Sequence, residues 1–231
     1  MLEISATDRW HDQFPGGCVG ILEMAGIDNT RRETPLDALK RQLEEELRRR
    51  YADYARADFL ALEAMAAYHR YYRQFDKTYH VLLQLESVVL KGKSLPAVSP
   101  LVDANFMAEL DTLVLTAGHD TARLQGAIRI DATDGSETFT QMNGNTRTLP
   151  AGDMCMMDQA GVSCTILYGQ DDRSPIRDAT SEVLYVSYAP EGVGGERVQM
   201  HLEKLRDYVR LFSQEAEMRQ MKLFTAGKKR G

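Results

Sequence analysis

The spacing of apolar residues changes abruptly along this chain, and that change restricts the fold more than any other feature. Between Pro35 and about Phe75, apolar side chains recur every three or four positions, which is the period of an amphipathic helix. Over residues 126–190 they form short runs bounded by turn residues, a pattern typical of strands joined by hairpins. Helical spacing resumes from Arg197 to Phe224. Because helices and strands are segregated along the chain, the sequence predicts an α+β fold with a mostly antiparallel sheet.

The individual elements have start and stop signals. Thr34 followed by Pro35 predicts the start of one long helix, with threonine as its cap. A second helix is predicted at Leu82–Leu90. A third is predicted to run to about Leu115, with Asp103 as its cap. Thr116–Asp120 is then predicted to be a loop, with Gly118 ending the helix. The predicted strands are Cys18–Met24, Ala127–Asp131, Glu137–Gln141, Asp153–Met157, Val162–Leu167 and Val183–Tyr188.

These elements predict one domain spanning residues 1–231, with three parts. Residues 1–75 hold an N-terminal strand and the long helix, and residues 76–190 hold a core with the site. Residues 191–231 hold a C-terminal helix and a basic tail whose last residues, Gly227–Gly231, are expected to fray. The long helix also offers a surface on which two copies could pair as a homodimer.

Charge and cysteine content limit the functional classes. Residues 100–200 hold 15 acidic and 6 basic side chains, a net charge of −9, which weakens a nucleic-acid interpretation without excluding it. The three cysteines, Cys18, Cys155 and Cys164, form no regular framework, so we expect free thiols in a reducing, cytoplasmic setting. No apolar run approaches the ~18 residues needed to cross a membrane, and we expect no membrane role.

The motifs of phosphoryl-transfer, nicotinamide-dependent and serine-esterase enzymes are absent from the sequence. It holds no phosphate loop, no Gly-x-Gly-x-x-Gly and no Gly-x-Ser-x-Gly. No His-x-x-x-His or Cys/His cluster suggests a zinc site. We therefore expect neither a cofactor nor a metal.

Two stretches place polar groups where structure alone does not require them. In the first, Asn105 and Glu109 lie four positions apart and share one helical face, and His119 and Asp120 follow a glycine. The alternative is a surface glutamate and a histidine that stabilises a helix end. The second stretch holds Gly169, Gln170, Asp172 and Arg173 after an apolar strand, where ligand sites tend to lie. Its alternative is a solvated loop with a local Asp–Arg pair.

These residues resemble the free-standing form of the B3/B4 domain of the phenylalanyl-tRNA synthetase beta subunit. The resemblance rests on Tyr71–Phe75, Val89–Pro96, Ser99–Asp103, Ala108–Leu110, Leu115–Asp120, Tyr168–Arg173, Thr180 and Val183–Val186, and it covers about residues 15–204. In the synthetase this α+β domain hydrolyses tyrosine wrongly esterified to the phenylalanine tRNA. The resemblance aligns Ala117 with the editing histidine and Asp172 with the editing glutamate of that domain. It therefore implies a branch whose pocket is rebuilt around Glu109, His119 and Asp120.

Three functions remain open from the sequence. The first is a trans-acting aminoacyl-tRNA deacylase. In this function His119, which Asp120 or Glu109 orients, activates the water molecule. Glu109 or Asp172 holds the ammonium group of the amino acid. The Gly169–Gln170 backbone stabilises the oxyanion. Asn105 and Arg173 complete the predicted substrate contacts. The second is a module that binds an amino acid or charged tRNA without hydrolysis. The third is a small-molecule hydrolase that acts without RNA.

Overall fold

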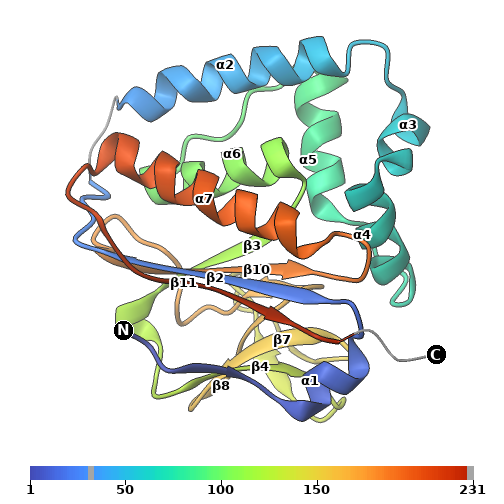
Figure 1. Cartoon of the computed structure of the whole chain (residues 1–231), viewed down its shortest axis with the longest axis vertical. Helices are drawn as coiled ribbons and strands as arrows, with labels where there is room; N and C mark the ends of the chain where they lie inside the picture. The colour runs from blue at the N-terminus through green and yellow to red at the C-terminus, as the bar shows by residue number, and fades with distance from the viewer. Residues whose placement is uncertain (31–33, 228–231) are drawn as a thin grey trace.

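A four-stranded sheet contains the apolar strand that the sequence predicts near its beginning. In this computed structural model, which describes residues 1–30 and 34–227, that strand is β2 (Cys18–Ala25), and all eight of its residues are buried. β10 (Glu182–Ala189) and β11 (Glu217–Thr225) flank β2, and β3 (Leu115–Asp120) pairs with β10. All three pairings are antiparallel, and the strand order is β11-β2-β10-β3 (Figure 1). β3 therefore lies at an edge of this sheet.

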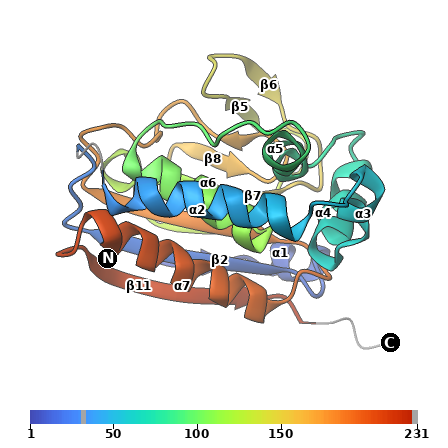
Figure 2. The ribbon, with the colours of Figure 1, turned by 90° about the horizontal axis from the view of Figure 1, so that it is seen from above.

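A second sheet of five strands lies on one side of the first, opposite the long helices (Figure 1). Its order is β1 (Ile4–Ala6), β4 (Ile128–Ala132), β7 (Met154–Asp158), β8 (Gly161–Thr165) and β9 (Gly169–Gln170). Only β1 and β4 are parallel within it. A separate hairpin, β5 (Thr138–Thr140) and β6 (Thr146–Thr148), projects from the body of the molecule (Figure 2). The predicted α+β class with mostly antiparallel pairing is confirmed.

Helices cover the other face of the four-stranded sheet. α7 (Gly195–Phe212) packs directly on β2, while α2 (Pro35–Arg50) and α6 (Pro100–Thr112) lie beside it (Figure 2). The packing is close, because a Cβ added at Gly20 of β2 would lie 2.5 Å from Val198 Cγ1 of α7. The remaining helices are α1 (Asp8–Gln13), α3 (Arg56–Ala61), α4 (Glu63–Arg73), α5 (His80–Val89) and a 3₁₀ turn at Thr121–Arg123.

The single long helix predicted over residues 35–75 is wrong, because the structure divides it into α2, α3 and α4. The chain turns after Arg50, where Tyr51 packs its ring against Tyr54 and Phe59 at centroid distances of 4.9 and 5.5 Å. Asp58 accepts a hydrogen bond from the Ala55 N–H at 2.8 Å, which starts α3. The aromatic residues that continue the apolar stripe therefore form a corner. The long surface on which the homodimer prediction rested is not present.

Three further boundaries differ from the sequence prediction. Residues 116–120, predicted to be a loop, belong to β3, because their backbone pairs with β10. The C-terminal helix ends at Phe212, and Glu217–Thr225 forms β11 even though it is rich in helix formers, since pairing with β2 overrides that propensity. α6 begins at Pro100 with Ser99 as its cap, so Asp103 lies in its first turn. The predicted fraying concerns Gly227–Gly231, of which residues 228–231 lie outside the described part of the chain.

Two further findings concern disulfide bonds and membrane-spanning helices. Cys18, Cys155 and Cys164 are all free and buried. None of the helices in the described ranges combines the length and apolarity that a bilayer-spanning helix requires.

Candidate functional site

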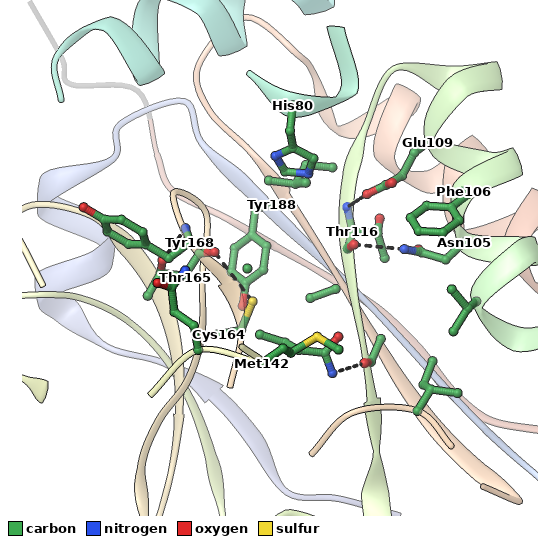
Figure 3. A pocket seen from close by; sticks show the side chains of 18 of the residues that line it. His80, Asn105, Phe106, Glu109, Thr116, Met142, Cys164, Thr165, Tyr168 and Tyr188 are labelled. Carbon is green, nitrogen blue, oxygen red and sulfur yellow. Dashed lines mark hydrogen bonds between the residues drawn. The ribbon is translucent and has the colours of Figure 1, made fainter. Parts of the chain in front are cut away.

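A cavity of about 530 Å³ opens between α5, α6, β3 and the β8–β9 turn, a size typical of small-molecule sites. Its wall is mostly apolar, with Val98, Val102, Phe106, Leu115, Ala117, Met142 and Ile176 among the residues that line it. A few polar side chains interrupt this wall, chiefly His80, Asn105 and Glu109 (Figure 3). The cavity therefore suits a ligand that has both an apolar part and a polar end.

Asn105 and Glu109 reach the cavity from the same face of α6, as their spacing of four predicts. Glu109 Oε1 accepts a hydrogen bond from the Thr116 N–H at 2.8 Å, and Asn105 Nδ2 donates to the Thr116 carbonyl at 3.1 Å (Figure 3). Both side chains thus satisfy the edge of β3. Asn105 Oδ1 is buried and has no hydrogen-bond partner among the described residues. An unsatisfied buried acceptor beside a carboxyl group is a ready site for a donor supplied by a ligand.

Burial changes the charge state of Glu109. Only 2% of this residue is exposed, and desolvation raises its pKa to about 8, partly offset by the hydrogen bond from Thr116. In the empty cavity the carboxyl group is therefore mostly protonated at neutral pH. A cationic ligand would stabilise the ionised form and release that proton.

His80, which the sequence did not single out, is a further polar group of the wall. It is the first residue of α5, and its side chain points into the cavity (Figure 3). Desolvation lowers its pKa to about 4, so the ring is neutral near pH 7. Tyr72 donates its hydroxyl hydrogen to the Ile166 carbonyl, so His80 Nδ1, 3.4 Å away, is assigned as the donor to Tyr72. His80 Nε2 is then an acceptor.

A buried polar network holds Thr116 from behind. Thr112 donates its hydroxyl hydrogen to the Ala108 carbonyl at 2.8 Å, so His201 Nδ1, 2.7 Å from Thr112 Oγ1, is assigned as a donor. His201 Nε2 then accepts from the Thr116 hydroxyl, which accepts in turn from Ser187 at 2.7 Å. Burial lowers the pKa of His201 to about 3, in agreement with this neutral ring. α7 thereby fixes the residue to which Asn105 and Glu109 are bound.

Thr116→Val is expected to lower the free energy of unfolding by roughly 2–6 kcal/mol. The substitution keeps the shape but leaves the Ser187 hydroxyl and His201 Nε2 buried without a partner, and each such group costs about 1–3 kcal/mol. Urea denaturation measures the change, with Thr148→Val on the exposed side of β6 as the matched control. Equal unfolding free energies for the two variants would show that the network contributes no stability.

Gly169 and Gln170, predicted as substrate contacts, also line the cavity. Gly169 has a φ of +75°, a conformation that glycine adopts without strain at the turn between β8 and β9. Gln170 Nε2 donates to the Gly118 carbonyl at 2.8 Å and to the Ser174 carbonyl at 3.3 Å, which ties the turn to β3. Gly118 has no room for a side chain, since an added Cβ would lie 2.6 Å from Ile176 Cδ1.

His119 and Asp120 lie outside the cavity wall. His119 is fully buried beneath residues 171–175, with Nδ1 2.7 Å from Ser174 Oγ, and burial lowers its pKa to about 3. Asp120 accepts hydrogen bonds from the Ala122 N–H at 3.1 Å and the Thr180 hydroxyl at 2.9 Å. Both residues hold the end of β3 and the loop that follows the β8–β9 turn. The chain does not fold back at Gly118, because β3 continues through His119.

Asp172 and Arg173 also lie outside the wall. Asp172 is exposed, and its N–H donates to the Thr140 carbonyl at 3.1 Å. Arg173 forms ion pairs with Asp171 at 2.7 Å and Asp158 at 3.2 Å. The structure thus brings four of the eight predicted site residues to one cavity: Asn105, Glu109, Gly169 and Gln170. Among the residues that it describes, no group of three or more His, Cys, Asp or Glu side chains is placed to hold a metal ion.

A family model described as the B3/4 domain matches residues 63–216, two thirds of the chain. The chain belongs to the B3/4 domain family. The resemblance inferred from the sequence is therefore confirmed, and every residue that lines the cavity falls within the matched span of this B3/4 domain. A search of curated proteins finds no significant match.

Among solved structures, this B3/4 domain is similar to an N-terminal fragment of the phenylalanyl-tRNA synthetase beta subunit from Pyrococcus horikoshii. The two are 11% identical, with a TM-score of 0.49. The similarity covers 96% of this chain and 50% of that one, so the chain spans about half the length of the solved fragment.

Proposed function

We propose that the cavity receives the aminoacyl end of a charged tRNA and that the protein hydrolyses the ester. The observation that carries the proposal is the pair of Glu109 and Asn105, an ionisable carboxyl group beside an unpartnered amide oxygen in a wall that is otherwise mostly apolar. An amino acid esterified to tRNA has an ammonium group that matches the carboxyl and amide oxygens, and a side chain that matches the apolar wall. This partner also places the proposed activity in the cytoplasm.

The ammonium group binds at the polar end of the cavity. Glu109 gives up its proton as the cation enters, and Asn105 Oδ1 accepts a second ammonium hydrogen. The amino-acid side chain then lies against the apolar wall around Phe106 and Val102. A buried ion pair is strongest when the remaining lone pairs of its carboxylate also accept hydrogen bonds. The Thr116 N–H already satisfies one lone pair of Glu109.

Hydrolysis needs a water molecule and an acceptor for its proton. We assign that acceptor to His80, because Nε2 is unprotonated at neutral pH and the side chain points into the cavity. The water oxygen attacks the ester carbonyl carbon while its proton passes to His80. The bond to the ribose oxygen then breaks, and the ribose oxygen takes the proton. Backbone N–H groups of the Gly169–Gln170 turn are proposed to stabilise the oxyanion.

One observation favours a second candidate function. A histidine whose pKa is near 4 is a weak base, and general-base catalysis is most effective when the pKa lies near the working pH. The same cavity would then bind an aminoacyl group without cleaving the ester. In this function the protein is a binding module for amino acids or charged tRNA.

A panel of charged tRNAs separates these functions. We expect the protein to release the amino acid from at least one tRNA faster than buffer does, and His80→Ala to slow that release by ~10²-fold, the usual contribution of a general base. Stable complexes without release would establish the binding module instead. Hydrolysis of small amino-acid esters with no release from any tRNA would favour a small-molecule hydrolase.

A further inference from the structure

Three side chains from distant parts of the sequence meet at the rim of the cavity. Tyr168, in the turn after β8, lines the cavity itself. Arg147 of β6 places its guanidinium carbon 4.4 Å from the centre of the Tyr168 ring, and Lys77, in the loop between α4 and α5, places Nζ 5.1 Å from it. An aromatic ring attracts cations through its electron-rich faces, so Tyr168 holds both charges next to the opening.

Neither cation has a carboxylate partner among the described residues. Within residues 1–30 and 34–227, no carboxylate lies within 4.0 Å of Lys77 or Arg147, whereas Arg173 and Lys204 are both in ion pairs. Arg147 Nε instead donates to Gln141 Oε1 at 2.9 Å, which orients the guanidinium from the hairpin. Lys77 is exposed, and Arg147 is half-buried. Two positive charges with no carboxylate partner in the described part of the chain therefore lie beside the opening, in a chain whose net charge is −6.

We propose that Lys77 and Arg147, held by Tyr168, bind the phosphodiester group that precedes the esterified nucleotide. This inference rests on the proposed function, because it takes the aminoacyl group to occupy the cavity. The ribose that carries the ester then lies at the opening and brings its 5′ phosphate with it. A guanidinium and an ammonium group are the side chains that recognise phosphate oxygens. The rest of the nucleic acid extends away over the hairpin and the α4–α5 loop.

This assignment explains how an acidic protein can bind a nucleic acid. Residues 100–200 have a net charge of −9, so long-range attraction to a polyanion is weak. A local contact at one phosphodiester needs only the two charges at the rim. We therefore expect recognition of the single-stranded end of the RNA rather than of its double-stranded body.

Two probes that cannot be hydrolysed test the proposal. One is a short single-stranded oligoribonucleotide that carries a 3′-aminoacyl amide, and the other is the same aminoacyl amide on adenosine, which has no phosphate. For Lys77→Ala/Arg147→Ala we expect about tenfold weaker binding of the oligonucleotide and unchanged binding of the nucleoside. The magnitude of the slope of log K against log salt should fall by roughly 0.7, since one single-strand phosphate contact is lost and each such contact contributes about 0.7.

Control variants locate the effect at the rim. Arg41→Ala/Lys93→Ala removes two exposed cations that do not line the cavity and should leave both affinities unchanged. Tyr168→Leu removes the ring that holds both cations and should bind the oligonucleotide more weakly than the wild type does. Thermal melts show that each variant is folded. Inorganic phosphate in millimolar amounts should compete with the oligonucleotide and not with the nucleoside.

The outcomes distinguish failure of this proposal from failure of the proposed function. Equal losses for both probes, or no loss for either, in Lys77→Ala/Arg147→Ala would overturn the phosphodiester site. If the wild type bound neither probe, the aminoacyl pocket itself would be refuted, and with it this inference. If an oligonucleotide without the aminoacyl group bound as tightly as the aminoacyl amide, and still in a manner dependent on Lys77 and Arg147, the phosphodiester site would stand and the aminoacyl pocket would be in error.

Discussion

Glu109→Gln is expected to be about as stable as the wild type near pH 4 and more stable by up to ~5 kcal/mol above pH 8. Burial raises the pKa of Glu109 from 4.5 to about 8, so the native state binds a proton that the unfolded state has released over that range. Wild-type stability therefore falls as the pH rises from about 4.5 to 8 and then levels off. Each pKa unit corresponds to about 1.4 kcal/mol. Glutamine keeps an oxygen that can accept from the Thr116 N–H.

Urea denaturation of both proteins at several pH values measures this difference. Other titrating groups are shared by the two proteins and cancel in the comparison. Glu45→Gln, which alters an exposed residue of α2, is the matched control and should follow the wild-type curve at every pH. Parallel curves for Glu109→Gln and the wild type would mean that Glu109 is ionised throughout, and they would remove the basis for proton release on binding.

The same variant should weaken binding of the 3′-aminoacyl amide of adenosine by ~10²-fold or more near pH 7.5, where the α-amino group of the ligand, with a usual pKa of about 7.7–8.0, is still mostly protonated. Removing one partner of a buried ion pair typically costs 3–5 kcal/mol, because the other charge remains buried and unpaired. Below pH 8 the wild type must first lose the Glu109 proton, so its affinity should rise as the pH approaches 8 from below. Titration calorimetry in two buffers of different ionisation heats measures the released proton directly.

A ligand without the ammonium group provides the control for this experiment. The corresponding deaminated acyl nucleoside should bind the wild type and Glu109→Gln equally, and its binding should release no proton. Asn105→Ala should weaken the ammonium-bearing ligand less than Glu109→Gln does, since it removes a neutral acceptor. Equal affinity of wild type and Glu109→Gln for the ammonium-bearing ligand would place the ammonium group elsewhere.

The sequence predicted those elements whose apolar pattern agrees with their final environment. β2 and β10 are short apolar runs between turn residues, and both were predicted within one residue at each end. β11 could not be predicted in this way, because Glu217–Thr225 is composed largely of helix formers and becomes a strand only through pairing with β2. The corner at Tyr51 was hidden for a related reason, since it contains neither glycine nor proline and its aromatic residues continue the helical spacing.

The candidate site was predictable where it depended on a single element. Asn105 and Glu109 share a face of α6 whatever surrounds that helix, so their spacing was sufficient. His119 could not be placed from its neighbours, because its position depends on the pairing of β3 with β10, in which its partner Leu184 lies 65 residues further along. His80 was missed because a lone histidine before an apolar helix has no distinguishing local pattern. Its importance follows from the cavity, which forms only when α5, α6 and β3 are packed together.

The strand order β11-β2-β10-β3 also determines when this protein can begin to fold. β2 is synthesised long before its first partner, which begins at Glu182, because more than 150 residues separate the two. At the usual synthesis rates of about 5–20 residues per second, β2 waits roughly 8–30 s with eight core residues exposed. β3 waits for the same strand. During synthesis, therefore, the nascent chain can assemble neither this sheet nor the cavity beside it until β10 has been made.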